Sequence, residues 1–261
     1  MDYQGGAIVV LTTAALIFLG GISFVVVAEV LRTRGFTRLS LDSKIVLTAT
    51  LALLMLGMVS VLFAEFSNPA TLGMLPLPQK LLVAFSQSVT ARTAGFTTIY
   101  IGAMAHYSLF LIMVLMFIGG ASGSTAGGIK VNTFGMLVAT VWSSIRGREY
   151  AGAFGREFTT QQIYRALAVV TLSLGLVAIV VLVLTMTEEF GFLDLLFETF
   201  SAFGTVGLST GVTPDLSMAG RLIISATMFA GRLGPLVLAT ALVQRQHPTA
   251  QRYPEEMVRI G

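Results

Sequence analysis

Long apolar runs dominate this chain and limit the folds that it can adopt. Several of them reach about 20 residues, the length that an α-helix needs to cross the ~30 Å hydrocarbon core of a bilayer. Apolar residues make up 55% of the 261 residues and charged residues only 11%. Soluble domains usually carry about a quarter charged residues, so the sequence predicts a multi-pass helical membrane protein.

Basic residues gather in alternate connections between the apolar runs. They are Arg32, Arg34, Arg38, Lys44, then Arg146, Arg148, Arg156, Arg165, and finally Arg245, Arg252 and Arg259. Because short connections rich in Lys and Arg stay cytoplasmic, we expect the N-terminus outside and the C-terminus in the cytoplasm. Topology and contact with membrane lipid thus explain the net charge of +3, and no nucleic-acid partner is expected.

The apolar runs predict five spanning segments and two shorter ones. The five spans are 6–31, 44–64, 105–146 with an interruption, 161–187 and 217–243. The shorter segments, 77–92 and 190–204, each precede a turn that contains glycine. Non-helical backbone at membrane depth is tolerated only where protein buries it or where it lines a water-filled path. We therefore expect these two segments to be re-entrant pore helices followed by pore loops.

Two parts of the chain match each other at a shift of 112 residues. Residues 84–96 fall on 196–208, and residues 116–120 fall on 228–232. Such internal repeats are typical of transporters. They predict three regions: the last helix of an incomplete repeat with a cytoplasmic linker (1–43), a helix–pore-loop–helix repeat (44–150), and a second such repeat with a cytoplasmic tail (151–261).

The repeated stretches carry the pattern of an ion selectivity filter. The candidate filter residues are Thr93, Ala94, Gly95, Phe96, Thr205, Val206, Gly207 and Leu208. A dehydrated cation needs oxygen ligands, which potassium filters supply from stacked backbone carbonyls. Glycine permits this backbone because it adopts positive φ without a Cβ clash. The pattern therefore predicts cation binding by the backbone carbonyls of these residues.

A glycine-rich stretch interrupts the helix after the first pore loop. Its candidate gate residues are Gly119, Gly120, Ser122, Gly123, Ser124, Thr125, Gly127, Gly128 and Lys130. Each glycine weakens a helix by about 1 kcal/mol relative to alanine. We expect a flexible loop below the filter, and close helix packing through small residues is the alternative.

Two arginines lie in apolar surroundings, where a charged side chain usually has a function. Arg232 occupies the repeat position of Gly120, so we expect it beside the glycine-rich stretch as part of the gate. Arg92 directly precedes Thr93. An unpaired buried arginine is costly, and Glu198 on the other pore helix is its predicted partner.

The sequence gives little support to an enzyme. It contains no cysteine and only two histidines, His106 and His247. Residues 120–123 fit the GxSG pattern of intramembrane serine proteases, whose serine needs a histidine base nearby. Neither histidine is expected at the depth of Ser122, so proteolysis is kept only as the alternative from another functional class.

These motifs together resemble the Trk/Ktr/HKT superfamily of potassium transporters, and they look like its bacterial Ktr/Trk membrane subunits. The matching stretches are 92–96, 119–130, 205–214 and 231–235. The resemblance implies an all-α transmembrane fold with four helix–pore-loop–helix repeats around one central pore, as in potassium channels. It makes Gly95 and Gly207 potassium-filter glycines, 119–128 an intramembrane gating loop and Arg232 a pore arginine.

The resemblance also implies a function and partners. It implies potassium uptake across a bacterial plasma (inner) membrane by a homodimer that sits on a cytosolic regulatory subunit binding ATP, ADP or NAD. Potassium is then the substrate, and no cofactor is expected in this chain. A sodium-permeable or Na⁺-coupled cation transporter of the same fold is the alternative.

The chain departs from the family pattern in its number of repeats. We expect only the third and fourth repeats and the last helix of the second, and two filter segments cannot encircle an ion. Either the chain is a piece of a longer one, or other copies or a separate half complete the pore. A tetrameric potassium channel would carry identical single units, and a non-conducting membrane subunit is a further alternative.

Overall fold

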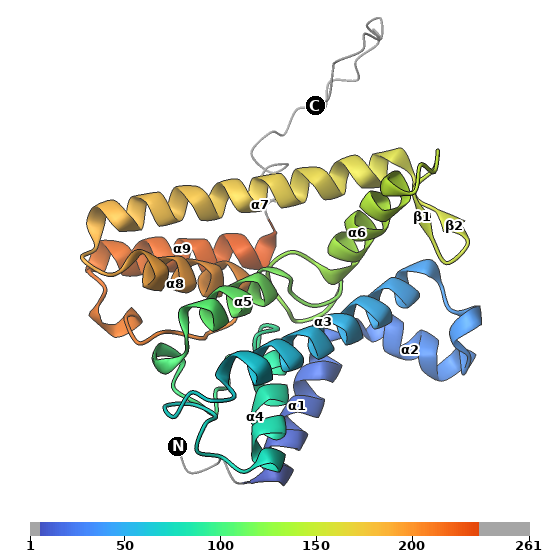
Figure 1. Ribbon diagram of the computed structural model, residues 1–261. Helices are drawn as coiled ribbons and strands as arrows, with labels where there is room; N and C mark the ends of the chain where they lie inside the picture. The colour runs from blue at the N-terminus through green and yellow to red at the C-terminus, as the bar shows by residue number, and fades with distance from the viewer. Residues whose placement is uncertain (1–5, 235–261) are drawn as a thin grey trace, which may run out of the picture.

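A computed structural model describes residues 6–234, and helices form most of its regular structure (Figure 1). In chain order these are α1 (Ala7–Gly21), α2 (Phe24–Thr33), α3 (Leu41–Glu65), α4 (Leu77–Thr90), α5 (His106–Phe117), α6 (Val131–Ile145), α7 (Thr160–Thr187), α8 (Phe192–Gly204) and α9 (Met218–Leu233). Three 3-10 turns cover Phe36–Arg38, Ile101–Ala103 and Thr213–Asp215. Strand β1 (Gly152–Ala153) pairs with β2 (Arg156–Glu157) in a short hairpin.

Two helices of the described range are each long and apolar enough to cross a membrane. They are α3, with 25 residues, and α7, with 28. Together, α1 and α2 could form one more span, but only a broken one, because they meet at an angle of 96°. The expected span 6–31 is therefore not one helix but two helices with a sharp bend between them.

The break between α1 and α2 has a local cause. Gly20 and Gly21 weaken the end of α1, and their carbonyls accept hydrogen bonds from residues 121 and 125 rather than from a following helical turn. Ser23 then begins the new helix by accepting a hydrogen bond from the amide of Val25. The chain turns at this point because another segment satisfies the last carbonyls of α1.

The other expected segments correspond to helices. Segment 44–64 lies within α3, 161–187 lies within α7, and the interrupted span 105–146 contains α5 and α6. The two short segments contain α4 and α8. Helix α9 covers the start of the expected span 217–243, and residues 235–243 lie outside the described residues.

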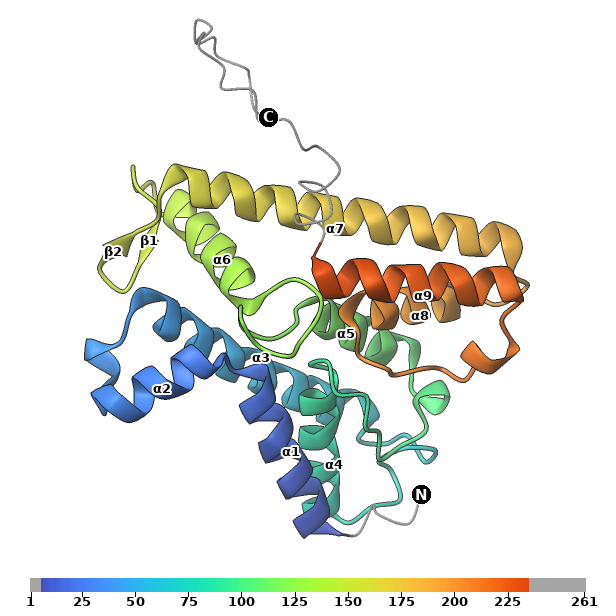
Figure 2. The same cartoon turned by 180° about the vertical axis from the view of Figure 1, so that it is seen from behind.

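The two halves of the chain follow the same order of elements. A long helix leads to a short helix, a loop and a second helix, first as α3–α4–α5 and then as α7–α8–α9. Helix α5 begins at His106 and α9 begins 112 residues later at Met218, and the turns Ile101–Ala103 and Thr213–Asp215 keep this offset. Helices α7, α8 and α9 lie together, while α1, α3 and α4 form the opposite side (Figures 1 and 2).

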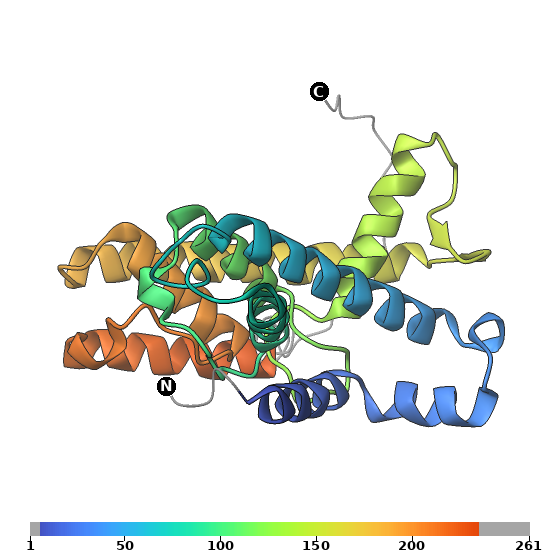
Figure 3. The same cartoon turned by 60° about the horizontal axis from the view of Figure 1, so that its bottom comes forward.

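The buried core lies where the two groups meet. Val83 on α4, Ile112 and Met116 on α5 and Phe197 on α8 are fully buried in one cluster. Helix α5 packs against both α3 and α8 and so connects the two halves. Figure 3 shows α4 end-on beside α3, with α6 pointing away from them.

A carboxylate closes each pore loop at the start of its second helix. Glu65, at the end of α3, accepts the backbone N–H of Ala105 at 2.9 Å. Glu188, just after α7, accepts the backbone N–H of Ser217 at 3.0 Å and the Ser217 hydroxyl at 2.5 Å. Ala105 and Ser217 are the N-cap residues of α5 and α9. We call this contact the carboxylate clasp, because it ties the end of the first helix of each repeat to the start of its second helix.

Replacing Glu188 tests the clasp. The Ser217 hydroxyl and backbone N–H hold the pKa of Glu188 below its usual value of 4.5. The stability that a lowered pKa brings is present above 4.5 and is lost as the pH falls through the lowered value. We expect Glu188→Gln to lower the melting temperature by a few degrees at pH 7, with the difference shrinking in acid. Glu189→Gln, at the exposed neighbouring carboxylate, is the control for thermal denaturation in detergent. A difference that persists in acid would contradict the clasp.

Candidate ion-conduction site

Both candidate filter segments leave their pore helix in a left-handed backbone conformation. The φ angles are +70° at Thr93 and +76° at Gly95, and +51° at Thr205 and +90° at Gly207. Thr205 is the C-cap of α8, whose last turn it closes by donating its amide to the Ala202 carbonyl. Threonine rarely adopts this conformation, and such strain persists only where the surroundings enforce it.

The two segments lie against each other. A Cβ atom placed on Gly207 would lie 3.7 Å from the Cα of Gly95, and one placed on Gly95 would overlap the carbonyl oxygen of Val206. Val206 and Leu208 are buried, whereas Phe96 is 65% exposed and Ala94 is half-buried. The fold therefore brings together the two segments that the sequence identified. That their carbonyls face one axis is a prediction.

A polar side chain from each pore helix supports the loop that follows its filter segment. Gln87 of α4 donates to the Thr97 hydroxyl at 3.1 Å. Glu198 of α8 accepts the Ser209 hydroxyl at 2.5 Å, the Thr210 N–H at 3.1 Å and the Thr213 hydroxyl at 2.6 Å. Both side chains are buried. Sequence reasoning missed Gln87, although an amide side chain among the apolar residues of a pore helix was a usable signal.

The predicted ion pair between Arg92 and Glu198 is wrong. The carboxylate of Glu198 is occupied by the three donors of the loop after its own filter segment. The Arg92 guanidinium donates instead through Nη2 to the carbonyl of Gly119, at 2.9 Å. A local set of backbone and hydroxyl donors satisfies the carboxylate, so it needs no distant cation.

The glycine-rich stretch forms a closed loop between α5 and α6. Gly119 N–H donates to the Ile129 carbonyl at 2.8 Å, and Ile129 N–H donates to the Phe117 carbonyl at 3.1 Å. Gly123 and Gly128 adopt positive φ. Gly119, Gly120, Gly127 and Gly128 are buried at the base, whereas Ser122, Gly123 and Thr125 are exposed at the tip and Ser124 is half-buried. We call residues 119–130 the Gly-rich loop.

The tip of the Gly-rich loop is held by the end of α1. The N–H of Ala121 donates to the Gly21 carbonyl at 2.9 Å, and the hydroxyl of Thr125 donates to the Gly20 carbonyl at 3.1 Å. At its other side, the N–H of Ser122 donates to the Asn132 side chain.

Two further contacts place the loop beside the second candidate filter segment and α9, and a third lies within the loop. A Cβ atom on Gly127 would overlap the Thr205 hydroxyl and would lie 2.9 Å from the Gly204 carbonyl oxygen. Arg232 donates to the carbonyl of Thr125, and Lys130 folds back to donate to the carbonyl of Ala126. Arg232 therefore lies beside the loop, as its repeat position predicts.

The serine-protease alternative does not fit this geometry. His106 is the first residue of α5, and Ser122 lies in the loop after the end of that helix. Twelve helical residues separate the two ends by about 18 Å at 1.5 Å per residue. His247 lies outside the described residues. Within residues 6–234 no group of three or more His, Cys, Asp or Glu side chains could hold a metal ion.

Comparison with known proteins identifies the family. A family model described as "TrkH: Cation transport protein" matches residues 1–251. The chain belongs to the TrkH family. This family consists of membrane transporters of the Trk/Ktr/HKT superfamily and not of enzymes, as the motifs indicated.

Individual relatives agree with this assignment. Ktr system potassium uptake protein B of Bacillus subtilis is 42% identical over 261 residues, which are 100% of this chain and 58% of the relative. Potassium/sodium uptake protein NtpJ of Enterococcus hirae is 40% identical over 264 residues, covering 99% of this chain and 58% of the relative. The chain thus spans less than two thirds of the length of these relatives.

A solved structure supports the fold. The crystal structure of the potassium transporter TrkH from Vibrio parahaemolyticus matches with a TM-score of 0.74 at 19% identity, covering 97% of this chain and 55% of that one. The all-α transmembrane fold predicted from the sequence is therefore confirmed.

Removing Glu198 tests its role behind the filter. Glu198→Ala leaves three buried or half-buried donors without their acceptor, and we expect the free energy of unfolding to fall by about 1–3 kcal/mol. Thr213→Val removes one donor and should cost less. The loss in the double variant should be smaller than the sum of the two single losses, because both changes remove one hydrogen bond in common. Strictly additive losses in thermal or denaturant unfolding would contradict this network.

Proposed function

We propose that this chain contributes two filter segments and an intramembrane gate to a pore for potassium uptake across a bacterial plasma (inner) membrane. The observation that carries the proposal is the arrangement of Gly95 and Gly207 face to face, with the Gly-rich loop packed against Thr205. The relative named Ktr system potassium uptake protein B supports potassium as the transported ion. Potassium is the substrate in this proposal, and the chain's own polar groups replace its water.

The backbone carbonyls of residues 93–96 and 205–208 bind the dehydrated ion in this proposal. Left-handed residues at alternate positions take the chain out of strand geometry, which allows successive carbonyls to face one axis. Helix α8 ends directly before Thr205, so its C-terminal end, with about half a negative charge, lies next to the filter. This field favours a cation over an anion.

The Gly-rich loop and Arg232 form the gate. The loop interrupts what would otherwise be a continuous helix after the first filter, and few side chains hinder its movement. Arg232 holds the loop through the carbonyl of Thr125, and its positive charge opposes a cation in the pore. Opening then requires the loop to leave Arg232 and the end of α1.

A sodium-permeable or Na⁺-coupled transporter is the second candidate. It is favoured by the relative named Potassium/sodium uptake protein NtpJ. For the assembly we propose a homodimer that binds a cytosolic regulatory subunit with ATP, ADP or NAD, because two relatives are named as components of a Ktr system. The proposed topology has the N-terminus outside and the C-terminus in the cytoplasm.

Gly207→Ala tests the filter. A Cβ atom fits beside Gly95, but φ of +90° is strained for alanine, by about 1–3 kcal/mol. We expect folded protein with a severalfold lower preference for K⁺ over Na⁺, measured by uptake in a complete transporter that carries this chain. Gly175→Ala is the control, since a Cβ atom there meets nothing within 4 Å. An unchanged preference would reject the filter assignment.

Arg232→Ala tests the gate. The loop loses a charged hydrogen-bond donor and the pore loses a positive barrier, so we expect severalfold higher resting K⁺ flux per folded molecule. Shortening the Gly-rich loop should have the same effect, and the two changes should not add because they remove one barrier. If Arg232 serves folding alone, the variant will yield less folded protein with no rise in flux per molecule.

A further inference from the structure

Arg92 is a buried arginine between the proposed filter and the proposed gate. The conduction steps proposed above do not use it. It stands at the end of α4, next to the first filter residue Thr93, and is only 7% exposed. Its Nη2 atom donates to the carbonyl of Gly119 at 2.9 Å. Its Nη1 atom is buried without a hydrogen-bond partner among the described residues. The Gly119 carbonyl is thus the protein acceptor on which this guanidinium depends.

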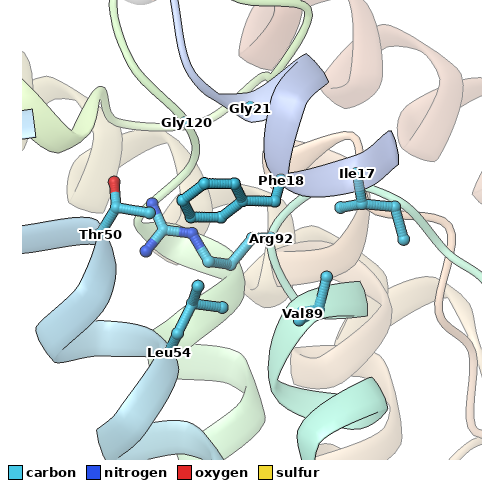
Figure 4. Close-up of a pocket in the computed structure, with 8 residues that line it drawn as sticks. All are labelled: Ile17, Phe18, Gly21, Thr50, Leu54, Val89, Arg92 and Gly120. Carbon is cyan, nitrogen blue, oxygen red and sulfur yellow. The ribbon is translucent and has the colours of Figure 1, made fainter. Parts of the chain in front are cut away.

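The surroundings of Arg92 fix the direction of the side chain. Figure 4 shows the guanidinium between Thr50 of α3 and Phe18 of α1, below the chain at Gly120. A cavity of about 20 Å³ adjoins it, and apolar side chains form most of its lining. Three helices and the Gly-rich loop therefore enclose the arginine, and they leave its charged end directed at the base of the loop.

Gly119 is the point at which this contact acts on the gate. The N–H of Gly119 donates to the Ile129 carbonyl and so closes the base of the loop. Its carbonyl has lost its helical partner, because α5 ends at Phe117. Arg92 supplies the missing donor. A single peptide unit is thus tied on one side to the loop and on the other to the residue before the filter.

In the second repeat, the corresponding positions are in contact without an arginine. The repeat positions of Arg92 and Gly119 are Gly204 and Gly231. A Cβ atom on Gly231 would overlap the carbonyl oxygen of Phe203, so α9 packs directly on the end of its pore helix. In the first repeat the helix is broken at this height, and the long side chain of Arg92 replaces direct packing.

We propose that Arg92 is a positioning residue that ties the filter to the gate, so that movement of the Gly-rich loop changes the ion preference of the filter. The proposal rests on the proposed function of these two elements and adds the connection between them. When the loop leaves the pore, Gly119 moves with it and Arg92 transmits the movement to Thr93. Filter and gate then act as one unit.

The test measures K⁺ and Na⁺ uptake per folded molecule in a complete transporter that carries this chain. Arg92→Met keeps the length and fills the apolar surroundings but removes every donor. We expect severalfold higher resting K⁺ flux together with a severalfold lower preference for K⁺ over Na⁺. Arg92→Lys keeps a charged hydrogen-bond donor. Its K⁺ flux and its preference for K⁺ over Na⁺ should lie between those of Arg92→Met and those of the unchanged protein. Arg232→Ala should raise the flux and also lower the preference, because the loop that it frees carries Gly119 and so moves Arg92.

Lys80→Met is the matched control for loss of a buried cation from the same helix. Lys80 donates to the carbonyl of Phe66 and is 8% exposed, and it lies in the first turn of α4, at the opposite end of that helix from Arg92. Lys80→Met should leave the K⁺ flux and the preference for K⁺ over Na⁺ per folded molecule unchanged. One outcome would overturn the tether alone. If Gly207→Ala lowers the preference for K⁺ while Arg92→Met changes neither the flux nor the preference, the tether is rejected and the filter assignment is kept.

Two further outcomes are decisive. If Gly207→Ala and Arg92→Met both leave the preference unchanged, the filter assignment is rejected and the tether with it. If Arg92→Met yields no folded protein, Arg92→Lys decides: intermediate flux and preference support the tether, and values equal to those of the unchanged protein overturn it.

Discussion

Backbone hydrogen bonding inside the membrane is the constraint on which this structure depends. A helix broken within the bilayer exposes carbonyls and amides that water cannot reach, and each unsatisfied group costs several kcal/mol. The break between α5 and α6 is stable because other parts of the chain supply the partners. The carbonyls of Gly20 and Gly21, the guanidinium of Arg92 and that of Arg232 all reach the Gly-rich loop. The loop is thus held by contacts that it shares with elements distant in sequence.

This arrangement explains why helices α1 and α8 end where they do. Each ends beside the Gly-rich loop or a candidate filter segment, where its last backbone groups have partners. Helix α1 ends at Gly21 and offers its carbonyls to the loop, while α8 ends at Gly204 and begins the second filter segment. The ends of the helices, rather than their sides, therefore build the site.

Much of the fold and part of the site could be predicted from the sequence. Apolar length located α3 and α7, and the 112-residue shift located both candidate filter stretches and placed Arg232 beside the loop. The bend after Gly21 could not be predicted, because it depends on partners that lie 100 residues further along the chain. The partner of Arg92 was missed for a related reason. Charge complementarity pointed to Glu198, whereas a backbone carbonyl and local hydroxyl groups satisfy the two residues separately.

The carboxylate clasp has a consequence for how the two repeats could diverge. In both repeats the carboxylate binds a backbone amide, which every residue except proline provides. The position can therefore hold alanine in one repeat and serine in the other, Ala105 and Ser217, without loss of the contact. A contact made through the main chain tolerates different side chains at this position. The two repeats can therefore differ in sequence here while each keeps its first helix tied to its second.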